Sequence, residues 1–261
     1  GGNSKNEVNV VCDGQSILLP TAIAGDEAVM MAQRLKNVPI LVGSDRYQTG
    51  LYAIEHFGVD TLILDDGFQH LALKRDMNIL LFDHQRPFGN GELFPAGELR
   101  EPKDQVHRAD FVFITRYSGS SYPPGISEQL IKDLPIIKST LRLDSLLSLS
   151  DGETIDVKKL QDHPVAAFSG IANPNDFRKL LEQSGARVVC YHPFPDHHEY
   201  NLSDLKYIED SALKSGAKII LTTEKDAIKI KPNSISLPFY KVALEMEILE
   251  GREVFNQQIL N

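Results

Sequence analysis

Residues 61–70 have the sequence TLILDDGFQH, in which a short apolar run is followed at once by two carboxylates and a glycine. In open α/β sheets, ligands bind outside the carboxyl ends of the strands. The run therefore predicts a strand that presents Asp65 and Asp66 at the ligand-binding edge of a sheet. Mg²⁺ commonly takes one or two protein carboxylates, so this pair suits a metal site linked to a nucleotide. Asp-Asp-Gly is also good turn chemistry, and both interpretations stay open.

Further short apolar runs alternate with amphipathic stretches, which is the pattern of βα units around a parallel sheet. Strands are expected at residues 39–42, 61–64, 78–82, 111–115, 165–169, 188–191 and 219–222. Most are continuous apolar runs, which predicts burial on both faces. Helices are expected at residues 27–35, 48–57, 176–183 and 203–215, the last of them capped by Ser203.

Two longer stretches, at residues 136–149 and 239–248, depart from this rhythm and are typical of extended chain. We predict that they form a two-stranded antiparallel ribbon between two α/β/α lobes with mainly parallel sheets. The expected limits are 1–135 for the first lobe, 136–150 and 238–250 for the ribbon, 151–237 for the second lobe, and 251–261 for a segment that returns to the first lobe.

The composition bounds the function only loosely. The chain of 261 residues is 42% hydrophobic and 24% charged, as expected of a globular protein. Its net charge of −9 argues against nucleic acid as a partner and against general attraction to an anionic membrane. Cys12 and Cys190 lie far apart, which predicts neither a disulfide framework nor a zinc site. No run approaches the roughly 20 apolar residues of a spanning helix.

A glycine-rich loop at residues 88–102 carries two further candidates, Arg100 and Glu101. The guanidinium of Arg100 suits a phosphate, and Glu101 suits the metal. An ordinary surface ion pair is the alternative. In a third motif, Asp26 follows Gly25 at the start of a helix, where a cap is the commoner role and a well-oriented base the alternative. Arg46 follows a strand and is expected to face the cleft of Asp65.

Two motifs of the second lobe follow strands: FPDHH at residues 194–198 and TTEKD at residues 222–226. A histidine can orient a carboxylate base or relay its proton near neutral pH. His197 is the candidate for this role, and His198 is expected to be a solvent-facing loop residue.

Taken in order, these motifs resemble the tetraacyldisaccharide 4'-kinase family over nearly the whole chain. They are GDE at 25–27, DR at 45–46, DDGFQH at 65–70, FGNG at 88–91, PAGELREP at 95–102, RAD at 108–110, DHH at 196–198 and TTEKD at 222–226. The resemblance implies transfer of the γ-phosphate of ATP, with Mg²⁺, to the 4'-hydroxyl of a tetraacyl disaccharide 1-phosphate, a lipid A precursor. It also implies a peripheral protein on the cytoplasmic face of the inner membrane of Gram-negative bacteria.

The resemblance assigns roles residue by residue. It implies that Asp26 is the general base and that His197 is its partner. Asp65, Asp66 and Glu101 match the metal-side carboxylates. The positions that face the phosphorylated sugar are matched by Arg46, Gln69, His70 and Arg100.

The chain departs from the family at one point, because no G-x-x-x-x-G-K-[ST] sequence occurs in it. In the family, that loop belongs to a first lobe like that of P-loop NTPases, and its amides and lysine hold the phosphates of ATP. The chain is then either a fragment or a paralogue that has lost ATP turnover. We favour a fragment with a truncated first lobe, and we expect little or no kinase activity. A sheet edge exposed by the truncation would favour self-association.

Two other functions compete with an impaired kinase. One is a binding module that holds the lipid disaccharide without nucleotide, through Arg46, His70 and Arg100. The other is a metal-dependent phosphoesterase of the DHH type, suggested by Asp196-His197-His198 together with upstream aspartates. Metal and nucleotide requirements would separate the three.

Overall fold

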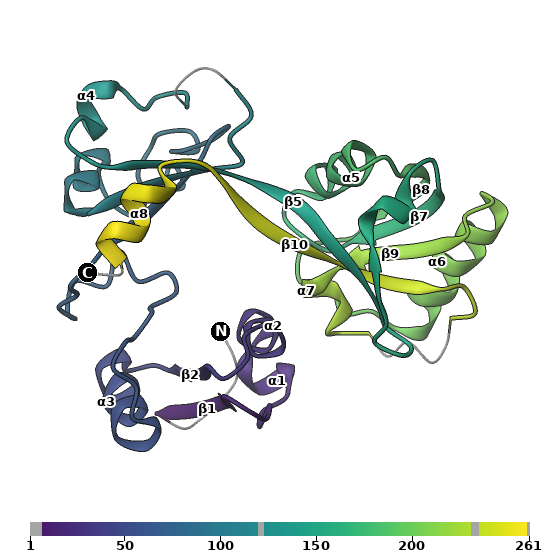
Figure 1. The fold of residues 1–261 in the computed structure, drawn as a ribbon, viewed down its shortest axis with the longest axis horizontal. Coiled ribbons are helices and arrows are strands. Elements are labelled where there is room, and N and C mark those ends of the chain that lie inside the picture. Colours follow the sequence, from purple (N-terminus) through teal and green to yellow (C-terminus); the bar gives the residue numbers. More distant parts are fainter. Residues whose placement is uncertain (1–6, 120–122, 231–234, 260–261) are drawn as a thin grey trace. The chain divides into compact units, whose positions relative to one another are not determined.

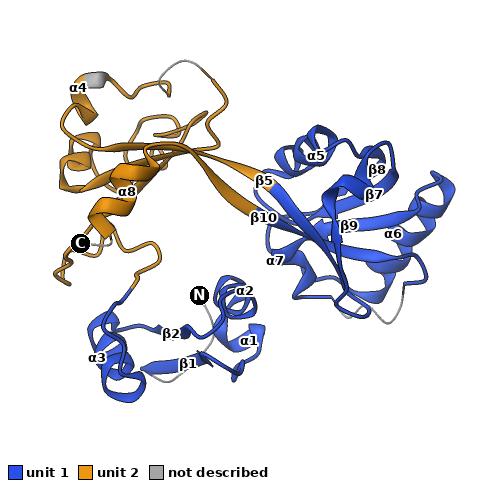
Figure 2. Ribbon diagram, viewed as in Figure 1, with its two compact units in different colours: residues 1–62, 143–244 blue, residues 63–142, 245–261 orange. Residues whose placement is uncertain are grey.

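The computed structural model describes residues 7–119, 123–230 and 235–259 of an α/β protein with a mainly parallel sheet and a small antiparallel one (Figure 1). Contacts divide the chain into two compact units (Figure 2). Unit 1 is Gly1–Leu62 with Leu143–Leu244, and unit 2 is Ile63–Arg142 with Glu245–Asn261. The lobe limits expected from the sequence follow chain order and stay a prediction.

The main sheet of unit 1 is parallel. Its strands, in spatial order, are β10 (Phe239–Glu250), β9 (Ile219–Thr223), β7 (Pro164–Ser169) and β8 (Arg187–Pro193). Helices α5 (Pro174–Gln183) and α6 (Leu202–Lys214) belong to separate hydrophobic clusters. Val165 and Ala167 of β7 pack in the cluster of α5, while Ala166 and Phe168 pack in that of α6. Successive side chains of a strand point to opposite faces, so the continuous apolar run of β7 is explained by a helix on each face.

The first part of unit 1 is a smaller layer. Strands β1 (Val8–Asp13) and β2 (Pro39–Gly43) pair antiparallel, and α1 (Thr21–Ala24), α2 (Asp26–Arg34) and α3 (Arg46–Phe57) accompany them. Ala28 and Val29 of α2 share a cluster with Ile228, the residue that follows α7 (Glu224–Ala227). Arg34 of α2 also contacts Glu224 of α7 at 2.7 Å. These contacts place α2 beside α7, the short helix that follows β9.

Unit 2 contains the parallel strands β3 (Ile79–Asp83), β4 (Phe111–Thr115) and the first part of β5 (Ile136–Ser148). The helical segments η1 (Lys103–Arg108) and α4 (Glu128–Ile131) accompany the sheet, and Val106 and Ile131 pack against Val112 and Ile114 of β4. On its other face, β4 contacts α8 (Arg252–Ile259), with Phe255 edge-on to Phe113 at 5.1 Å.

Strands β5 and β10 each contribute residues to both units and are neighbours in the sheet. The amide of Leu149 donates to the carbonyl of Phe239 at 2.9 Å. Arg142 pairs with Glu245 at 2.6 Å, and Lys138 with Glu250 at 2.8 Å. Residues progressively earlier in β5 thus meet residues progressively later in β10, so the two strands are antiparallel, as the sequence predicted.

The prediction of a strand at residues 61–64 is wrong. These residues have no regular secondary structure, and Ile63 is 93% exposed. A strand needs a neighbour to satisfy its backbone groups, and no described strand pairs with this segment. Asp65 and Asp66 lie in a turn, where Asp66 has a left-handed φ of 47°. The turn interpretation of Asp-Asp-Gly therefore describes the local backbone.

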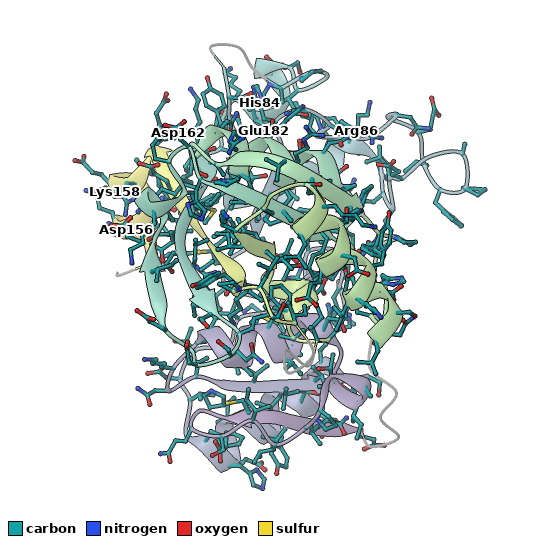
Figure 3. All side chains as sticks on the ribbon, turned by 90° about the vertical axis from the view of Figure 1, so that its right-hand side faces the viewer. His84, Arg86, Asp156, Lys158, Asp162 and Glu182 are labelled. Atoms are coloured by element: carbon teal, nitrogen blue, oxygen red, sulfur yellow. The ribbon has the colours of Figure 1, made fainter. Side chains whose placement is uncertain are left out.

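Two smaller differences concern element ends and short strands. Helix α6 is capped by Asn201, in a capping box with Asp204, and Ser203 is not its cap. The sequence reasoning missed β1, and it missed the short strand β6 (Thr154–Asp156), which pairs with β5 and leads into η2 (Val157–Leu160). Charged side chains lie at the periphery here, for example Asp156 and Lys158 (Figure 3).

Across the described residues, the helices are all too short or too polar to cross a membrane.

Candidate active site

Asp26 is the first residue of α2. The N-cap is Gly25, whose φ of 90° suits a glycine and which has no side chain to satisfy the helix amides. A carboxylate in the first turn is favoured by the helix dipole. The side chain of Asp26 is only 13% exposed, and it contacts His197 and Lys229 rather than the amides of its own helix. The side chain of Asp26 therefore belongs to a cluster of polar residues and does not cap its own helix.

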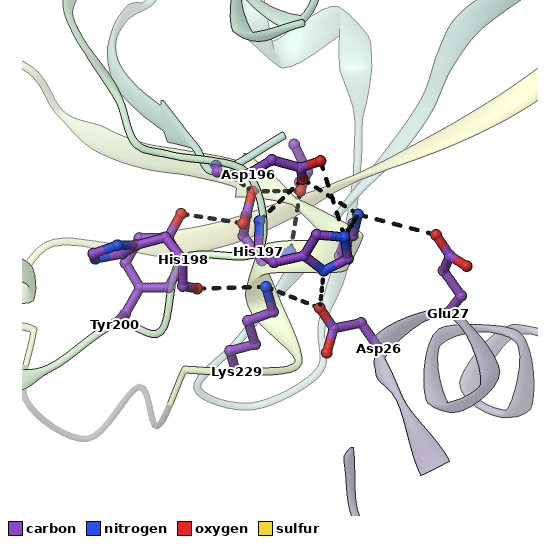
Figure 4. A network of polar contacts seen from close by, with 11 residues as sticks. Asp26, Glu27, Asp196, His197, His198, Tyr200 and Lys229 are labelled. Carbon is purple, nitrogen blue, oxygen red and sulfur yellow. Dashed lines mark hydrogen bonds and ion pairs between the residues drawn. The ribbon is translucent and has the colours of Figure 1, made fainter. Parts of the chain in front are cut away.

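His197 comes from the turn between β8 and α6 and contacts Asp26 directly. Its Nδ1 lies 3.2 Å from Oδ2 of Asp26, although the two residues are 171 positions apart (Figure 4). Its backbone has a φ of 60°, which is uncommon outside glycine. The amide of His197 donates to the carbonyl of Gly170 at 3.2 Å. The fold thus holds the imidazole against the carboxylate.

A buried lysine completes the contacts of Asp26. Nζ of Lys229 lies 2.9 Å from Oδ2 of Asp26, and the lysine side chain is 1% exposed. Partial burial, the largest single influence, raises the pKa of Asp26. The hydrogen bonds from Lys229 and His197, together with the positive charge of Lys229, outweigh it and lower that pKa below its ordinary value. The carboxylate is therefore ionised at neutral pH.

Lys225 contacts the other side of the imidazole. Its Nζ lies 3.3 Å from Nε2 of His197 and 3.4 Å from Oδ1 of Asp196. An ammonium has donors only, so Nε2 is the acceptor in this contact and the ring proton sits on Nδ1. In this tautomer the imidazole donates its Nδ1–H to Asp26, and contacts at both nitrogens fix the orientation of the ring.

Behind the His197 turn lies a buried carboxylate, Asp226 of α7. It is fully buried and accepts hydrogen bonds from the amide of Gly170 at 3.0 Å, from Thr223 Oγ1 at 2.7 Å and from the hydroxyl of Tyr200 at 3.1 Å. Burial, and then the charge of Asp226, raise the pKa of Tyr200 well above its ordinary value, so the phenol stays a donor. A side chain on Gly170 would meet Tyr200 Oη at 2.9 Å, which explains the glycine.

The expectation that His198 faces solvent is wrong. Its Nε2 lies 3.1 Å from Oδ2 of Asp204, and its side chain is 25% exposed, against 61% for His197. The ring also contacts those of Phe194 and Tyr200. Asp204 is itself held by the capping box of α6, so His198 ties the turn to that helix.

The remaining candidates of unit 2 lie in loops. Asp66 pairs with Arg100 at 2.8 Å, and both side chains are well exposed. Glu101 accepts two hydrogen bonds from Arg108, at 2.7 and 2.8 Å. In the described residues there is no cluster of three or more His, Cys, Asp or Glu side chains suited to a metal ion. In the structure, Asp66 and Arg100 are thus paired with each other, and Glu101 is paired with Arg108.

The other three candidates are placed as follows. Arg46 is the first residue of α3 and belongs to unit 1, where Asp45 caps the helix by accepting hydrogen bonds from the amides of Tyr47 and Gln48. Gln69 is exposed, and His70 is half-buried in the loop after the Asp-Asp-Gly turn.

Sequence reasoning missed Lys229 and the role of Lys225. Both follow β9, at positions i and i+4 of a segment that turns away from the strand. That spacing puts two lysines on one side of a helical turn, which is the signal that was available. Their partners come from distant parts of the chain, so the spacing alone does not reveal them.

Fold and site together define an α/β protein with a carboxylate, a histidine and a buried lysine gathered at the carboxyl ends of parallel strands. Such a cluster is equipped to accept a proton from a hydroxyl group. The chain belongs to the tetraacyldisaccharide-1-P 4'-kinase family, whose sequence pattern it matches over residues 1–261. The family resemblance seen in the motifs is thereby confirmed.

Relatives and a solved structure agree with this assignment. The tetraacyldisaccharide 4'-kinase of Syntrophus aciditrophicus is 43% identical over 260 residues, which cover 95% of this chain and 70% of the relative. The tetraacyldisaccharide 4'-kinase of Geobacter sulfurreducens is 39% identical over 251 residues, which cover 96% of this chain and 69% of the relative. This chain is also similar to the crystal structure of "apo" form LpxK from Aquifex aeolicus in complex with ATP. The TM-score is 0.76, the sequence identity is 31%, and the match covers 99% of this chain and 75% of the LpxK chain.

Proposed function

We propose that this chain carries the acceptor side of an ATP-dependent phosphorylation of the 4'-hydroxyl of a tetraacyl disaccharide 1-phosphate. Asp26 acts as the general base, and His197 orients it. Family membership, the names of the relatives and the ATP in the similar crystal structure support this proposal. The observation that carries it is the 3.2 Å contact between His197 Nδ1 and Asp26 Oδ2.

In the proposed reaction, the 4'-oxygen of the sugar attacks the γ-phosphorus of ATP and its proton passes to the carboxylate of Asp26. The bond between the γ-phosphorus and the oxygen bridging to the β-phosphate breaks, and ADP leaves. Phosphoryl transfer depends mainly on positioning and charge neutralisation, so a preoriented base suits it. His197 keeps its Nδ1 proton and holds the carboxylate in place.

On the sugar side, we assign Arg46, Gln69, His70 and Arg100 to the phosphorylated disaccharide. The chemistry of an arginine fork fits a phosphate group. Arg100 is well exposed, so its partner Asp66 can be exchanged for a ligand at small cost.

On the metal side, Asp65 and Asp66 fit Mg²⁺, because the ion takes only one or two carboxylates and both residues sit on an exposed turn. We propose Glu101 as their companion: each of its oxygens accepts one hydrogen bond from Arg108 and keeps a second lone pair. When bound, Mg²⁺ supplies neutralisation of the phosphate charges.

We further propose that these 261 residues by themselves transfer phosphate poorly, since they contain no G-x-x-x-x-G-K-[ST] sequence to hold the nucleotide. We propose that the protein acts at the cytoplasmic face of the inner membrane, as a peripheral protein.

In the described sheet β3 pairs only with β4, and Leu81 of β3 is 59% exposed. That edge is the proposed site of self-association.

An assay of 4'-phosphorylation with MgATP tests the proposal. It compares this chain with the native reading frame extended through any Gly-Lys-Thr loop. We expect transfer by the extended protein and little by the chain alone. Full activity of the chain alone would contradict the proposed impairment. If neither protein transfers phosphate, yet both bind the disaccharide without Mg²⁺ or nucleotide, the kinase proposal fails and the binding module takes its place.

A further inference from the structure

We propose that Lys229 is a positioning residue for this reaction, which holds one oxygen of Asp26 so that the other oxygen receives the proton. The inference rests on the proposed role of Asp26 as the base. It names the reacting atom, Oδ1 of Asp26, and it gives a role to a lysine outside the motifs.

The geometry around the carboxylate carries the assignment. In the described part of the chain, the two polar partners of the Asp26 side chain both reach Oδ2, with Lys229 Nζ at 2.9 Å and His197 Nδ1 at 3.2 Å. An oxygen that already accepts two hydrogen bonds, one of them from an ammonium, is a poor proton acceptor. Oδ1 is therefore the more basic oxygen, and it is the atom that we assign to the 4'-hydroxyl proton.

Burial makes Lys229 a fixed partner rather than a surface ion. The side chain is 1% exposed, and an ammonium removed from water is costly unless a carboxylate and hydrogen bonds compensate it. Nζ also lies 3.4 Å from the carbonyl of His198, and the amide of Lys229 donates to the carbonyl of Asp226 at 3.0 Å. Lys229 is thus anchored to the turn that carries His197 as well as to Asp26 (Figure 4).

Other charged groups lie near Asp26 and Lys229 and influence the protonation of Asp26 less directly. Lys225 reaches His197, Asp196 and Glu27, with Nζ 4.0 Å from Oε1 of Glu27. Asp196 lies beside His197, with Oδ2 at 3.9 Å from Nε2. The positive charges of Lys225 and Lys229 favour the ionised form of Asp26, while the carboxylates of Glu27 and Asp196 oppose it. Among the described contacts, Lys229 supplies the cation in contact with Asp26.

A purely structural ion pair would hold α2 and contribute to stability without setting the protonation of a base. The two roles are separated by following the titration of the Asp26 carboxyl carbon by NMR. Lys229→Met keeps the length of the side chain and removes its charge. We expect the titration midpoint of Asp26 to rise by about one to three pH units in this variant. The matched control is Lys214→Met on the exposed end of α6, which should leave the midpoint unchanged.

Kinetics of the native polypeptide that includes these residues give a second readout. In Lys229→Met we expect kcat to fall with little change in KM, and the acid limb of the pH–rate profile to move to higher pH. If the variant does not fold, the unsubstituted chain provides the test. The chemical shifts of Lys229 Nζ and of the Asp26 carboxyl carbon should then change with pH at one shared midpoint. An unshifted Asp26 titration in Lys229→Met, or separate midpoints in the unsubstituted chain, would overturn the inference.

The two proposals can fail separately. Should Asp26→Asn remain active while Lys229→Met shifts the Asp26 titration, the ion pair is real but Asp26 is not the base. Should Asp26→Asn be inactive while Lys229→Met leaves titration and kcat unchanged, the base stands and the role of Lys229 is refuted.

Discussion

Asp226 and His197 are joined through one residue, Gly170, whose amide donates to Asp226 and whose carbonyl accepts from the amide of His197. A buried carboxylate thereby fixes the turn that carries the imidazole. The same carboxylate accepts from Tyr200, so several buried donors depend on it.

We predict that Asp226→Ala lowers the free energy of unfolding by about 2–4 kcal/mol, because buried donors would lose their acceptor. Urea unfolding followed by circular dichroism measures this. The control is Asp210→Ala on the exposed face of α6, for which we expect a change within about 0.5 kcal/mol. A similarly small effect of Asp226→Ala would show that the buried network is dispensable.

His197→Ala should reduce kcat of the native polypeptide by roughly 10²–10⁴, the range of general acid–base contributions, with a smaller change in KM. The physical reason is the loss of the group that orients Asp26. His56→Ala, at an exposed position of α3, is the control and should retain full activity. Equal rates for the two variants would remove His197 from the proposed mechanism.

The lowered pKa of Asp26 makes stability depend on pH. A carboxyl group whose pKa is lower in the folded state stabilises the protein above its unfolded-state pKa of about 3.9, and this contribution disappears as pH falls through the folded-state value. We expect the free energy of unfolding to decline below about pH 4, and to decline less steeply in Asp26→Asn. Urea unfolding at pH 7, 5, 4 and 3 tests this, and identical pH dependences would contradict it.

Exposed Leu81 on β3 predicts self-association of the chain. Leu81→Lys should shift the sedimentation distribution toward monomer, since a charge on an edge strand opposes pairing with another chain. Leu213→Lys, on an exposed position of α6, controls for added charge. A concentration-independent monomer before any substitution would refute the edge as a site of association.

The sequence was a good guide where apolar pattern and neighbours agree. Strand β4 occupies the predicted residues 111–115, because a continuous apolar run there is covered on both faces. The pattern failed at residues 61–64, where the run is equally apolar but no described strand lies beside it. Apolar pattern predicts a strand only when a neighbour exists to satisfy its backbone.

The candidate site was predictable only in part. Asp26 and His197 were found through family resemblance, and the structure brings them together. Lys229 was missed because its i, i+4 spacing from Lys225 does not reveal its partner Asp26, which lies far away in the sequence. The metal role of Glu101 stays a prediction, and its pairing with Arg108 was not foreseen, since local pairing in a loop depends on the folded backbone.

The most direct test of the account is the single-turnover rate of 4'-phosphorylation by the native polypeptide carrying Asp26→Asn. This substitution keeps the size of the side chain and removes its basicity. We predict a fall of roughly 10²–10⁴ in the rate, with binding of the disaccharide retained. An unchanged rate in a folded Asp26→Asn variant would contradict the assignment of Asp26 as the base.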